Sequence, residues 1–358
     1  MRVLVTGHSG YIGSVLVPRL VALGYDVHGL DSDLFAACTF LPEGVASIPS
    51  VRRDLRDVTR ADLEGFDAVV HLANLSNDPL GNLNPALTYE INHTATVRLG
   101  EHARAAGVRR FLFASSCSLY GAAGQHAVTE EAAFHPQTPY GEAKVLAERD
   151  LAPLATDTFS PVFLRNATVY GVSPRLRFDL VVNNLTAWAV TTGQILLKSD
   201  GTPWRPLVHV EDVCRAVEAV LDAPREAIHN EAFNVGRNGE NYQIRQVAEI
   251  VGDVVPDCAV AFAGGASPDT RSYQVDFSKI QRHVPSFQPQ WTVRRGVEQL
   301  FAAFRDAALT PDAFEGPQYR RLKRLEVLLD AGAIDANLRW STAPVAGAGV
   351  AAAPVASG

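Results

Sequence analysis

Short apolar runs alternate with longer helical patterns along the first half of the chain. Two stretches with apolar residues at helical spacing, 11–24 and 85–107, predict helices that each end at a glycine. Pro18 lies within the first of them, so we expect it in or near the first helical turn. Strands that alternate with helices of this length predict an α/β fold with a parallel, doubly wound sheet. The runs that predict its strands are MRVLVTG (1–7), DVHGLD (26–31), DAVVHLA (67–73) and RRFLFASS (109–116).

The pattern changes after about residue 165, where helical stretches alternate with single strand-like pieces. This change predicts a smaller α/β lobe that is partly interleaved with the first. Residues 318–332 predict a further amphipathic helix, whose arginines we interpret as a solvated face rather than a binding patch. Residues 342–358 lack charge, aromatic side chains and periodicity, which predicts a disordered tail. The helical stretches of the second lobe are 177–193, 210–223, 242–255 and 293–307.

The overall composition is that of a globular enzyme, with 47% hydrophobic and 20% charged residues. A net charge of -7 argues against sequence-independent binding to nucleic acid or to an anionic membrane, although a few local arginines can still hold an anionic small ligand. The chain contains no run of eighteen apolar residues, so we expect no membrane span and a cytoplasmic protein. Neither a disulfide framework nor a metal site is expected, because the four cysteines form no C-x-x-C pair: Cys38, Cys117, Cys214 and Cys258.

Three glycines follow the first predicted strand directly and open the first predicted helix. Gly7, Gly10 and Gly13 lie in TGHSGYIG. A nucleotide pyrophosphate needs this combination, because the backbone must approach it without Cβ atoms and the helix N-terminus supplies N–H groups. The spacing G-x-x-G-x-x-G differs from the common G-x-G-x-x-G fingerprint. The strand–turn–helix context still favours a dinucleotide site.

Acidic residues at the ends of the next two predicted strands extend this site. Asp31 ends the second strand, where its carboxylate can accept hydrogen bonds from the adenosine ribose hydroxyls. Because the same charge would repel a 2′-phosphate, Asp31 favours NAD over NADP. Asp54 follows the third strand, where it faces the adenine or simply forms a polar turn with Asp57.

A tyrosine and a lysine in the segment YGEAK have the spacing of one helical turn. Tyr140 and Lys144 therefore share a helix face. Lowering a tyrosine pKa from about 10 to about 7 takes about 4 kcal/mol, which a nearby ammonium and a positive nicotinamide ring can supply. We place the Ser116 hydroxyl beside Tyr140, although Ser115 and Ser118 are close alternatives. Cys117 has no base that the sequence can assign, so we interpret it as a packed or substrate-side thiol.

Taken together, these motifs resemble the extended short-chain dehydrogenase/reductases, and most nearly the NAD-dependent epimerase/dehydratase family that acts on nucleotide sugars. The resemblance covers roughly residues 1–310 and implies a Rossmann-like fold, bound NAD and a homodimer formed through helices near 85–107 and 138–155. The motifs occur in the family's order: TGHSGYIG, Asp31, Asp54-x-x-Asp57, HLA (71–73), Asn92, SSCSLYG (115–121) and YGEAK (140–144).

The resemblance also implies roles for individual residues. Tyr140 is the general base, Lys144 holds the nicotinamide ribose and lowers the tyrosine pKa, and Ser116 assists. Asn92 corresponds to a structural helix asparagine of the family. Residues 1–165 are expected to form the NAD-binding domain, 166–310 mainly the substrate lobe, and 311–341 a helical extension. The cofactor contacts implied beyond the glycines and aspartates are Tyr11, Ile12, Leu55, Leu72 and Ala73.

The substrate end of the site depends mainly on the resemblance. Arg205 and Arg271 match the family's positions for arginines that hold the sugar-nucleotide pyrophosphate. A guanidinium group can donate two parallel hydrogen bonds to a phosphate. The segment LRNATVYG (164–171) matches the strand that ends at the substrate pocket, with Thr168 where the family commonly has Asn. We expect the loop 76–85 near the mouth of the site. The candidate sugar contacts are Ser118, Asn166, Thr168 and Asn184.

The resemblance implies one shared chemical step, in which Tyr140 takes a hydroxyl proton while hydride leaves the same carbon for NAD. The 4-keto sugar that forms can be reduced from the other face, can lose water, or can lose carbon dioxide. The family's dehydratases have Asp-Glu where this chain has Cys117-Ser118, so the sequence favours a 4-epimerase. The alternatives are an NAD(P)H-dependent 4-keto-sugar reductase, then a decarboxylase or a dehydratase, and a dinucleotide-binding sensor without catalysis.

Overall fold

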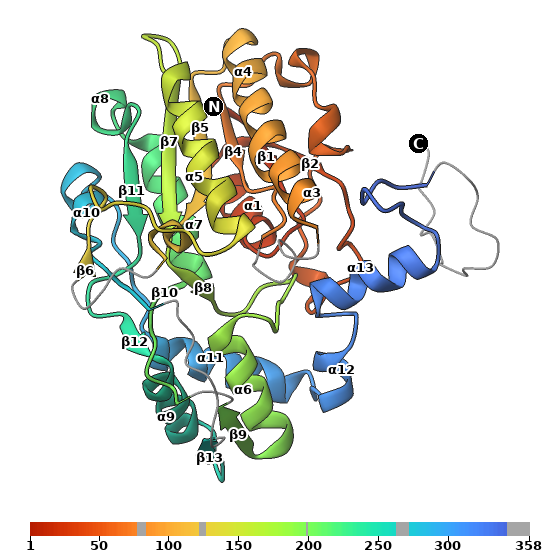
Figure 1. Cartoon of the computed structure of the whole chain (residues 1–358). Coiled ribbons are helices and arrows are strands. Elements are labelled where there is room, and N and C mark those ends of the chain that lie inside the picture. Colours follow the sequence, from red (N-terminus) through yellow and green to blue (C-terminus); the bar gives the residue numbers. More distant parts are fainter. Residues whose placement is uncertain (77–83, 122–126, 198–199, 263–271, 342–358) are drawn as a thin grey trace.

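A computed structural model describes residues 1–76, 84–121, 127–197, 200–262 and 272–341 (Figure 1). Arg271, most of the loop 76–85 and the predicted tail 342–358 lie outside the described residues. The central element is a seven-stranded sheet with the order β11-β7-β5-β4-β1-β2-β3. Its strands are Arg2–Thr6 (β1), Asp26–Asp31 (β2), Ser50–Arg52 (β3), Ala68–His71 (β4), Arg110–Ser116 (β5), Ser160–Asn166 (β7) and Ala232–Val235 (β11).

Every pair of neighbouring strands in this sheet is parallel, as the alternation of strands and helices predicted. Strands β4 and β7 are buried along their whole length, which explains the apolar runs at 68–70 and 161–164. The chain order reverses at β1, since β2 lies on one side of it and β4 on the other. A crevice opens at the carboxyl ends of strands at such a point, and ligands bind there.

Helices cover both faces of the sheet (Figure 1). One apolar cluster joins β1 and β4 to α1 (Gly13–Ala22) and α7 (Val210–Asp222). A second cluster on the opposite face joins β4 and β5 to α4 (Thr96–Ala105) and α5 (Pro139–Leu151). The doubly wound α/β architecture is therefore confirmed. Shorter helices at its edges are α3 (Pro85–Tyr89), α8 (Arg225–Ile228) and α10 (Ser278–His283).

The predicted position of Pro18 is wrong. Helix α1 begins at Gly13, and Pro18 lies inside it in the second turn. The glycine turn fixes this start, because a Cβ on Gly13 would lie 2.3 Å from the Gly7 carbonyl oxygen. The missing N–H of Pro18 leaves the Ser14 carbonyl without its usual helical donor.

The helix predicted over 85–107 is interrupted in its middle. A π-helical segment, Glu90–Ala95, separates α3 from α4. Asn92 lies in this segment, fully buried, and its side chain donates to the Leu75 carbonyl (2.9 Å) and accepts from the Leu75 amide (2.8 Å). Asn92 thus fixes the chain that leaves β4, which is a structural task.

The second lobe lies below the carboxyl ends of the sheet in Figure 1. Its core is an apolar cluster between α6 (Val181–Thr192), α9 (Ile244–Val254) and α11 (Val293–Asp306). The two lobes are interleaved, because β11 returns from the second half of the chain to pair with β7. The small sheets are β8 (Thr168–Tyr170) with β10 (Trp204–His209) and β12 (Asn241–Gln243), β9 (Gln194–Leu197) with β13 (Ala259–Phe262), and β6 (Ala127–Val128) with β14 (Gln274–Val275).

Two helices follow the second lobe, α12 (Pro311–Glu315) and α13 (Arg321–Asp330). The predicted helix at 318–332 is therefore present. The interpretation of its arginines as a solvated face is wrong for Arg321, which is only 4% exposed. The reason is that α13 lies against the main domain rather than in solvent, with Leu325 and Leu328 packed near Leu34.

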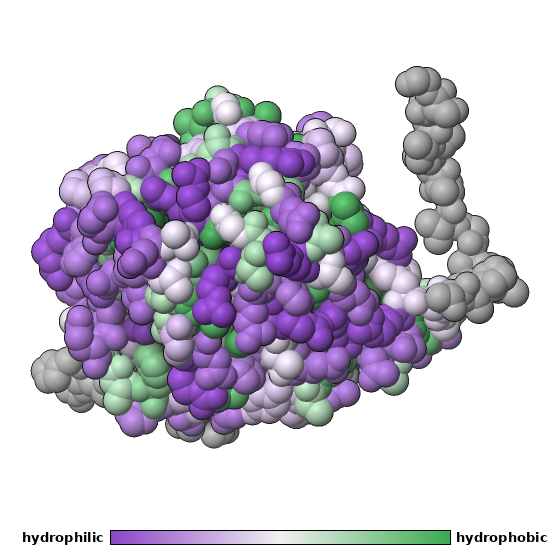
Figure 2. All heavy atoms as spheres, turned by 90° about the horizontal axis from the view of Figure 1, so that it is seen from above, coloured by the Kyte–Doolittle hydropathy of each residue, from purple (hydrophilic) through white to green (hydrophobic). Residues whose placement is uncertain are grey.

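Within the part of the chain that the structure describes, every helix is too short or too polar to cross a bilayer. Polar residues cover most of the face seen in Figure 2, and apolar ones lie there in small separate groups.

Candidate active site

A cavity of about 1300 Å³ lies between the carboxyl ends of the central strands and the second lobe. Its walls combine segments that are far apart in the sequence, from Gly7 to Leu338. Every residue that the sequence proposed for the site lines this cavity, except Arg271, which lies outside the described residues. These residues are Gly7, Gly10, Tyr11, Ile12, Gly13, Asp31, Asp54, Leu55, Leu72, Ala73, Ser116, Ser118, Tyr140, Lys144, Asn166, Thr168, Asn184 and Arg205.

The glycine turn between β1 and α1 has the shape that a dinucleotide pyrophosphate requires. Gly7 adopts a φ of +74°, and a Cβ there would lie 2.7 Å from the Ala73 nitrogen. No side chain caps the N-terminus of α1 at Ile12, within the described chain. Tyr11, Ile12 and Gly13 line the cavity at the start of α1, so the positive end of the helix dipole faces it, and the residues present fit the phosphates of NAD.

The carboxylates of Asp31 and Asp54 differ in how many hydrogen bonds they already accept from the protein. Asp31 accepts hydrogen bonds from the amides of Ser9 (3.2 Å) and Asp33 (2.9 Å), which leaves lone pairs for ribose hydroxyls. The Arg56 guanidinium donates two hydrogen bonds to the Asp54 carboxylate, at 2.9 and 2.7 Å. The Arg56 amide donates a third. Burial favours the neutral acid, but these hydrogen bonds from Arg56 outweigh it and lower the pKa of Asp54. Asp54 thus forms a polar turn at the cavity wall.

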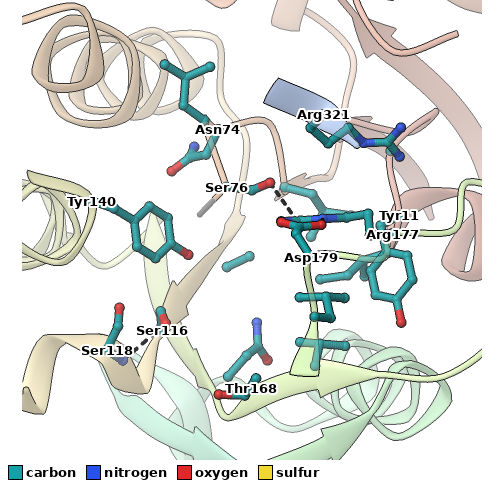
Figure 3. A pocket seen from close by; sticks show the side chains of 18 of the residues that line it. Tyr11, Asn74, Ser76, Ser116, Ser118, Tyr140, Thr168, Arg177, Asp179 and Arg321 are labelled. Carbon is teal, nitrogen blue, oxygen red and sulfur yellow. Dashed lines mark hydrogen bonds and ion pairs between the residues drawn. The ribbon is translucent and has the colours of Figure 1, made fainter. Parts of the chain in front are cut away.

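Tyr140 and Lys144 occupy the first two turns of α5. The Thr138 hydroxyl caps this helix by accepting from the Gly141 amide at 3.2 Å, and Pro139 follows at the first helical position. The Lys144 ammonium nitrogen lies 5.6 Å from the Tyr140 ring centroid and donates to the Asn74 side chain (2.7 Å) and the Ala114 carbonyl (2.6 Å). Figure 3 shows the Tyr140 side chain pointing into the cavity, on the same side as Ser116 and Ser118.

Burial lowers the pKa of Lys144 to about 7, although the charge of Glu148 opposes this change. Only 2% of Lys144 is exposed, and desolvation disfavours its charged form. The amine therefore gains or loses a proton close to neutral pH. This differs from the fully charged ammonium that the sequence alone suggests.

Two serines follow β5 at the cavity wall, and they differ in their hydrogen bonds. The Ser116 oxygen accepts from the Ser118 amide (3.2 Å) and so caps the 3-10 turn Cys117–Tyr120. The Ser118 hydroxyl is buried without a partner among the described residues, and so is the side-chain oxygen of Asn166. A buried polar atom without a partner costs about 1–3 kcal/mol. Both atoms line the cavity, so a polar ligand there would satisfy them.

Cys117 packs beneath the site and takes no part in its lining. Its side chain is fully buried, and the thiol donates to the Arg165 carbonyl at 3.1 Å. Burial raises the pKa of the thiol far above its usual range. Of the two interpretations of Cys117, the structure therefore favours the packed thiol over the substrate-side thiol.

A buried ion pair that sequence reasoning missed holds α5 against the sheet. The Arg165 guanidinium on β7 lies 2.7 Å from the Glu148 carboxylate on α5, and both side chains are 6% exposed. The Ser115 hydroxyl also donates to Glu148, and Arg165 donates to the Tyr120 hydroxyl (3.0 Å). Glu148 lies one helical turn beyond Lys144, so this network fixes the helix that carries Tyr140. No spacing rule links Arg165 to Glu148, so local sequence contains no signal for the pair.

His71 provides a second buried support, at the end of β4. Its ring nitrogens lie 2.6 Å from the Thr6 hydroxyl and 2.9 Å from the Thr96 hydroxyl. Burial, with a smaller contribution from Lys144, lowers the pKa of His71 to about 3, so the ring is neutral at physiological pH. His71 therefore joins β1, β4 and α4 without adding charge beside Lys144.

The substrate side of the cavity is lined by the second lobe. Arg205 on β10 donates to the Trp204 carbonyl (2.8 Å), and Asn184 on α6 donates to the Phe178 carbonyl (2.9 Å). Sequence reasoning missed Arg177 and Asp179, which form a two-point pair at 3.0 and 2.6 Å. Arg177 also donates to the Ser76 hydroxyl at 2.8 Å, across the cavity wall (Figure 3).

The described residues bring together no group of histidine, cysteine, aspartate or glutamate side chains that could hold a metal ion. The polar groups of the cavity instead suit an organic ligand with hydroxyl and phosphate groups. They include a glycine turn at a helix N-terminus together with serine, asparagine and arginine side chains.

Comparison with known proteins places this cavity in context. A sequence profile of the NAD dependent epimerase/dehydratase family matches residues 3–236. A UDP-glucose 4-epimerase of Mycolicibacterium smegmatis is 31% identical over 322 residues, which cover 86% of this chain and 99% of that protein. UDP-glucuronic acid decarboxylase 1 of Arabidopsis thaliana is 27% identical, over 88% of this chain and 72% of its own length. The structure of MoeE5 in complex with UDP-glucuronic acid and NAD aligns with a TM-score of 0.75 and 29% identity, over 86% of this chain and 100% of MoeE5.

Proposed function

Because the chain belongs to the NAD dependent epimerase/dehydratase family, whose members are NAD-dependent enzymes of the extended short-chain dehydrogenase/reductase type, we propose that it is a nucleotide-sugar 4-epimerase. The resemblance inferred from the sequence motifs is confirmed by this membership, as is NAD as the cofactor. The proposal goes further, to inversion of C4 of the sugar through a transient 4-keto intermediate.

The observation that carries the proposal is the unpartnered Ser118 hydroxyl next to Ser116, where elimination would need an acid and a base. The described carboxylates of the cavity offer no such pair. Asp31 and Asp54 belong to the adenosine end, and the charge of Asp179 is engaged by Arg177. Glu315 is likewise paired, with Arg320. A pair of serines can bind sugar hydroxyls and a keto oxygen, which is what epimerisation requires.

Each residue has a defined task in this proposal. The Tyr140 phenolate takes the proton of the sugar hydroxyl and, as the phenol, later returns it, while Ser116 donates a hydrogen bond to the same oxygen. Lys144 binds the nicotinamide ribose and favours the ionised form of Tyr140. Bound NAD would supply reversible hydride transfer at the sugar carbon. Ser118 and Asn166 hold the sugar while its two faces are presented in turn.

The nucleotide end of the substrate has its own candidate contacts. Arg205, Asn184 and Thr168 line the cavity on the side of the second lobe. Arg205 supplies a positive charge for a diphosphate, and a guanidinium suits phosphate geometry. MoeE5 binds UDP-glucuronic acid, and the mycobacterial relative is a UDP-glucose epimerase, so uridine diphosphate sugars are the first substrates to test.

The test is an incubation of the purified protein with UDP-, dTDP-, GDP- and ADP-sugars, including UDP-glucose and UDP-glucuronic acid, without added NAD(P)H. We expect one sugar to equilibrate with its C4 epimer, detected by NMR. Tyr140→Phe serves as the control and gives no epimer.

Three other results would each replace the proposal. Product only when NADH and a 4-keto sugar are supplied indicates a reductase. Release of carbon dioxide from UDP-glucuronic acid indicates a decarboxylase, the activity of the Arabidopsis relative. Bound NAD with no conversion of any sugar indicates a sensor, although this chain retains both Tyr140 and Lys144. The expected homodimer and the division into domains at residues 165 and 310 stay predictions.

A further inference from the structure

The segment that follows the second lobe, residues 311–341, is here called the C-terminal extension. It contains α12, α13 and a closing turn in which Ile334 bridges to Trp340. One face of α13 and this turn build a separate apolar cluster against the main domain. The members of the cluster from the main domain are Leu34, Leu75 and Leu87, and those from the extension are Leu325, Leu328, Ile334 and Leu338.

The end of the extension is fastened to the wall that the adenosine half of NAD would contact. The Trp340 indole donates to the Ser32 carbonyl at 2.7 Å, and the Arg52 guanidinium lies 4.1 Å over the Trp340 ring. Ser32 directly follows Asp31, the proposed ribose contact. The extension is therefore hydrogen-bonded to the residue next to Asp31, whose carboxylate is the proposed ribose contact.

A second set of contacts ties the extension to the turn after β3. Arg339 forms a two-point ion pair with Asp57, at 2.6 and 3.1 Å. Arg56 donates to the Asn337 carbonyl at 2.8 Å with the same guanidinium that holds Asp54. Both partners belong to the segment 54–57, whose residues Asp54, Leu55 and Arg56 line the cavity.

The extension also enters the cavity wall itself, through Glu315, Arg320, Arg321 and Leu338. Arg321 is buried and donates from Nη2 to the Arg175 carbonyl at 2.9 Å, while its guanidinium lies 4.9 Å over the Phe35 ring. Its Nη1 is buried and makes no hydrogen bond among the described residues, although the Cys38 side chain lies close to the guanidinium. A buried, charged N–H group without a hydrogen bond is costly, and an anionic acceptor would remove that cost. The phosphates of a dinucleotide are such acceptors.

We propose that the C-terminal extension forms part of the NAD site, enclosing the adenosine half of the dinucleotide and slowing its release, with Arg321 donating to an oxygen of the adenosine diphosphate. The Trp340 and Arg339 contacts hold the extension closed over Asp31 and Asp54. This role depends on NAD binding alone, so it holds for an epimerase, a reductase or a decarboxylase alike.

The test measures how fast NAD leaves the protein. The holoenzyme is loaded with NADH, mixed with a large excess of NAD, and the loss of bound-NADH fluorescence is followed over time. In the double variant Arg339→Ala/Trp340→Ala, which removes both fastenings, we expect NADH to dissociate at least fivefold faster than from the parent. Arg294→Ala, which removes an exposed arginine paired with Asp253 and away from the cavity, is the matched control and leaves the rate unchanged.

Arg321→Ala tests the direct contact while both fastenings remain. We expect at least a fivefold faster dissociation here too, and a smaller effect for Arg321→Lys, which keeps the charge. Thermal unfolding of each variant establishes that it is folded at the temperature of the measurement. Dissociation from folded Arg321→Ala or from the folded double variant that is less than fivefold faster than from the parent overturns the proposal.

Discussion

The two ends of the cavity are built in different ways. At the reacting end, Tyr140 and Lys144 are held by a buried ion pair between Glu148 and Arg165, each 6% exposed. At the adenosine end, the corresponding ion pair joins Arg339 to Asp57, whose side chains are 37% and 53% exposed. The ion pair of the reacting end is out of reach of water, whereas the Arg339–Asp57 pair of the adenosine end is screened by it.

This difference has consequences for stability. Breaking a buried pair leaves a charge without water or partner and costs several kcal/mol, while an exposed pair contributes about 1 kcal/mol or less. The reacting end is therefore expected to be rigid. At the adenosine end the exposed Arg339–Asp57 pair contributes little, so the extension is held mainly by its buried apolar cluster with Leu34 and Leu75.

The largest effect is expected at the reacting end from Tyr140→Phe. Without the phenol, no group is positioned to take the sugar hydroxyl proton, so turnover falls at least about 1000-fold. NAD stays bound, because the glycine turn and Asp31 are unchanged. The measurement combines initial rates with the NAD released on denaturation of the purified variant. Full activity would sink the assignment of Tyr140 as the base.

The next effect tests the rigidity of the same end. Glu148→Gln leaves the Arg165 guanidinium buried without its counter-charge, and we expect a loss of about 3 kcal/mol in the free energy of unfolding. Urea unfolding of parent and variant measures it. The double variant Glu148→Leu/Arg165→Met, which removes both charges, is expected to regain most of this loss. A single variant as stable as the parent would show that the pair does not hold α5.

A third prediction uses the pKa of Lys144, which is about 7 in the folded protein and 10.5 in an unfolded chain. Between these values the unfolded chain binds a proton that the folded one does not, so Lys144 lowers the stability progressively as the pH falls from 10.5 to 7. Lys144→Met lacks this dependence. The parent should therefore lose about 1.4 kcal/mol of unfolding free energy when the pH is lowered from 9 to 8, and the variant should not. The difference, variant minus parent, increases by that amount.

Urea unfolding of both NAD-free proteins at pH 8 and pH 9 provides the measurement. Below about pH 7 the difference should become constant, because Lys144 is then protonated in both states. Parallel stability curves over the whole range would contradict the burial-induced change in pKa.

The smallest effect is expected at the adenosine end. Arg339→Ala removes an exposed ion pair, so the free energy of unfolding should change by no more than about 1 kcal/mol. The same urea experiment detects it, and raising the salt concentration should shrink the difference further. A loss close to that of Glu148→Gln would remove the contrast between the two ends.

Much of the site follows from local sequence. Gly7, Gly10 and Gly13 follow a strand and precede a helix, so the turn is predictable within seven residues, although its close approach to Ala73 is not. Tyr140 and Lys144 share a helix face because of their spacing. Such features can be predicted because every atom involved is close along the chain. Pro18 was misplaced for a related reason, since the start of α1 depends on a carbonyl contact that the helical pattern does not contain.

Other parts of the site depend on residues that are far apart in the sequence. Arg321 is close to the cavity only because α13 packs on Leu34 and Leu75, and its amphipathic pattern predicts a helix without its partner. The pair Glu148–Arg165 and the contact of Asn92 with Leu75 are likewise set by how helices lie on the sheet.

The sequence by itself determined the doubly wound α/β fold, the dinucleotide turn and the Tyr140–Lys144 pair, because local periodicity and spacing fix those features. The tertiary structure decided which polar groups lack a partner, how far burial lowers the pKa of Lys144, and that the C-terminal extension lies against the adenosine wall. These properties arise from desolvation and from contacts between distant segments, and both exist only once the chain has closed around its cavity.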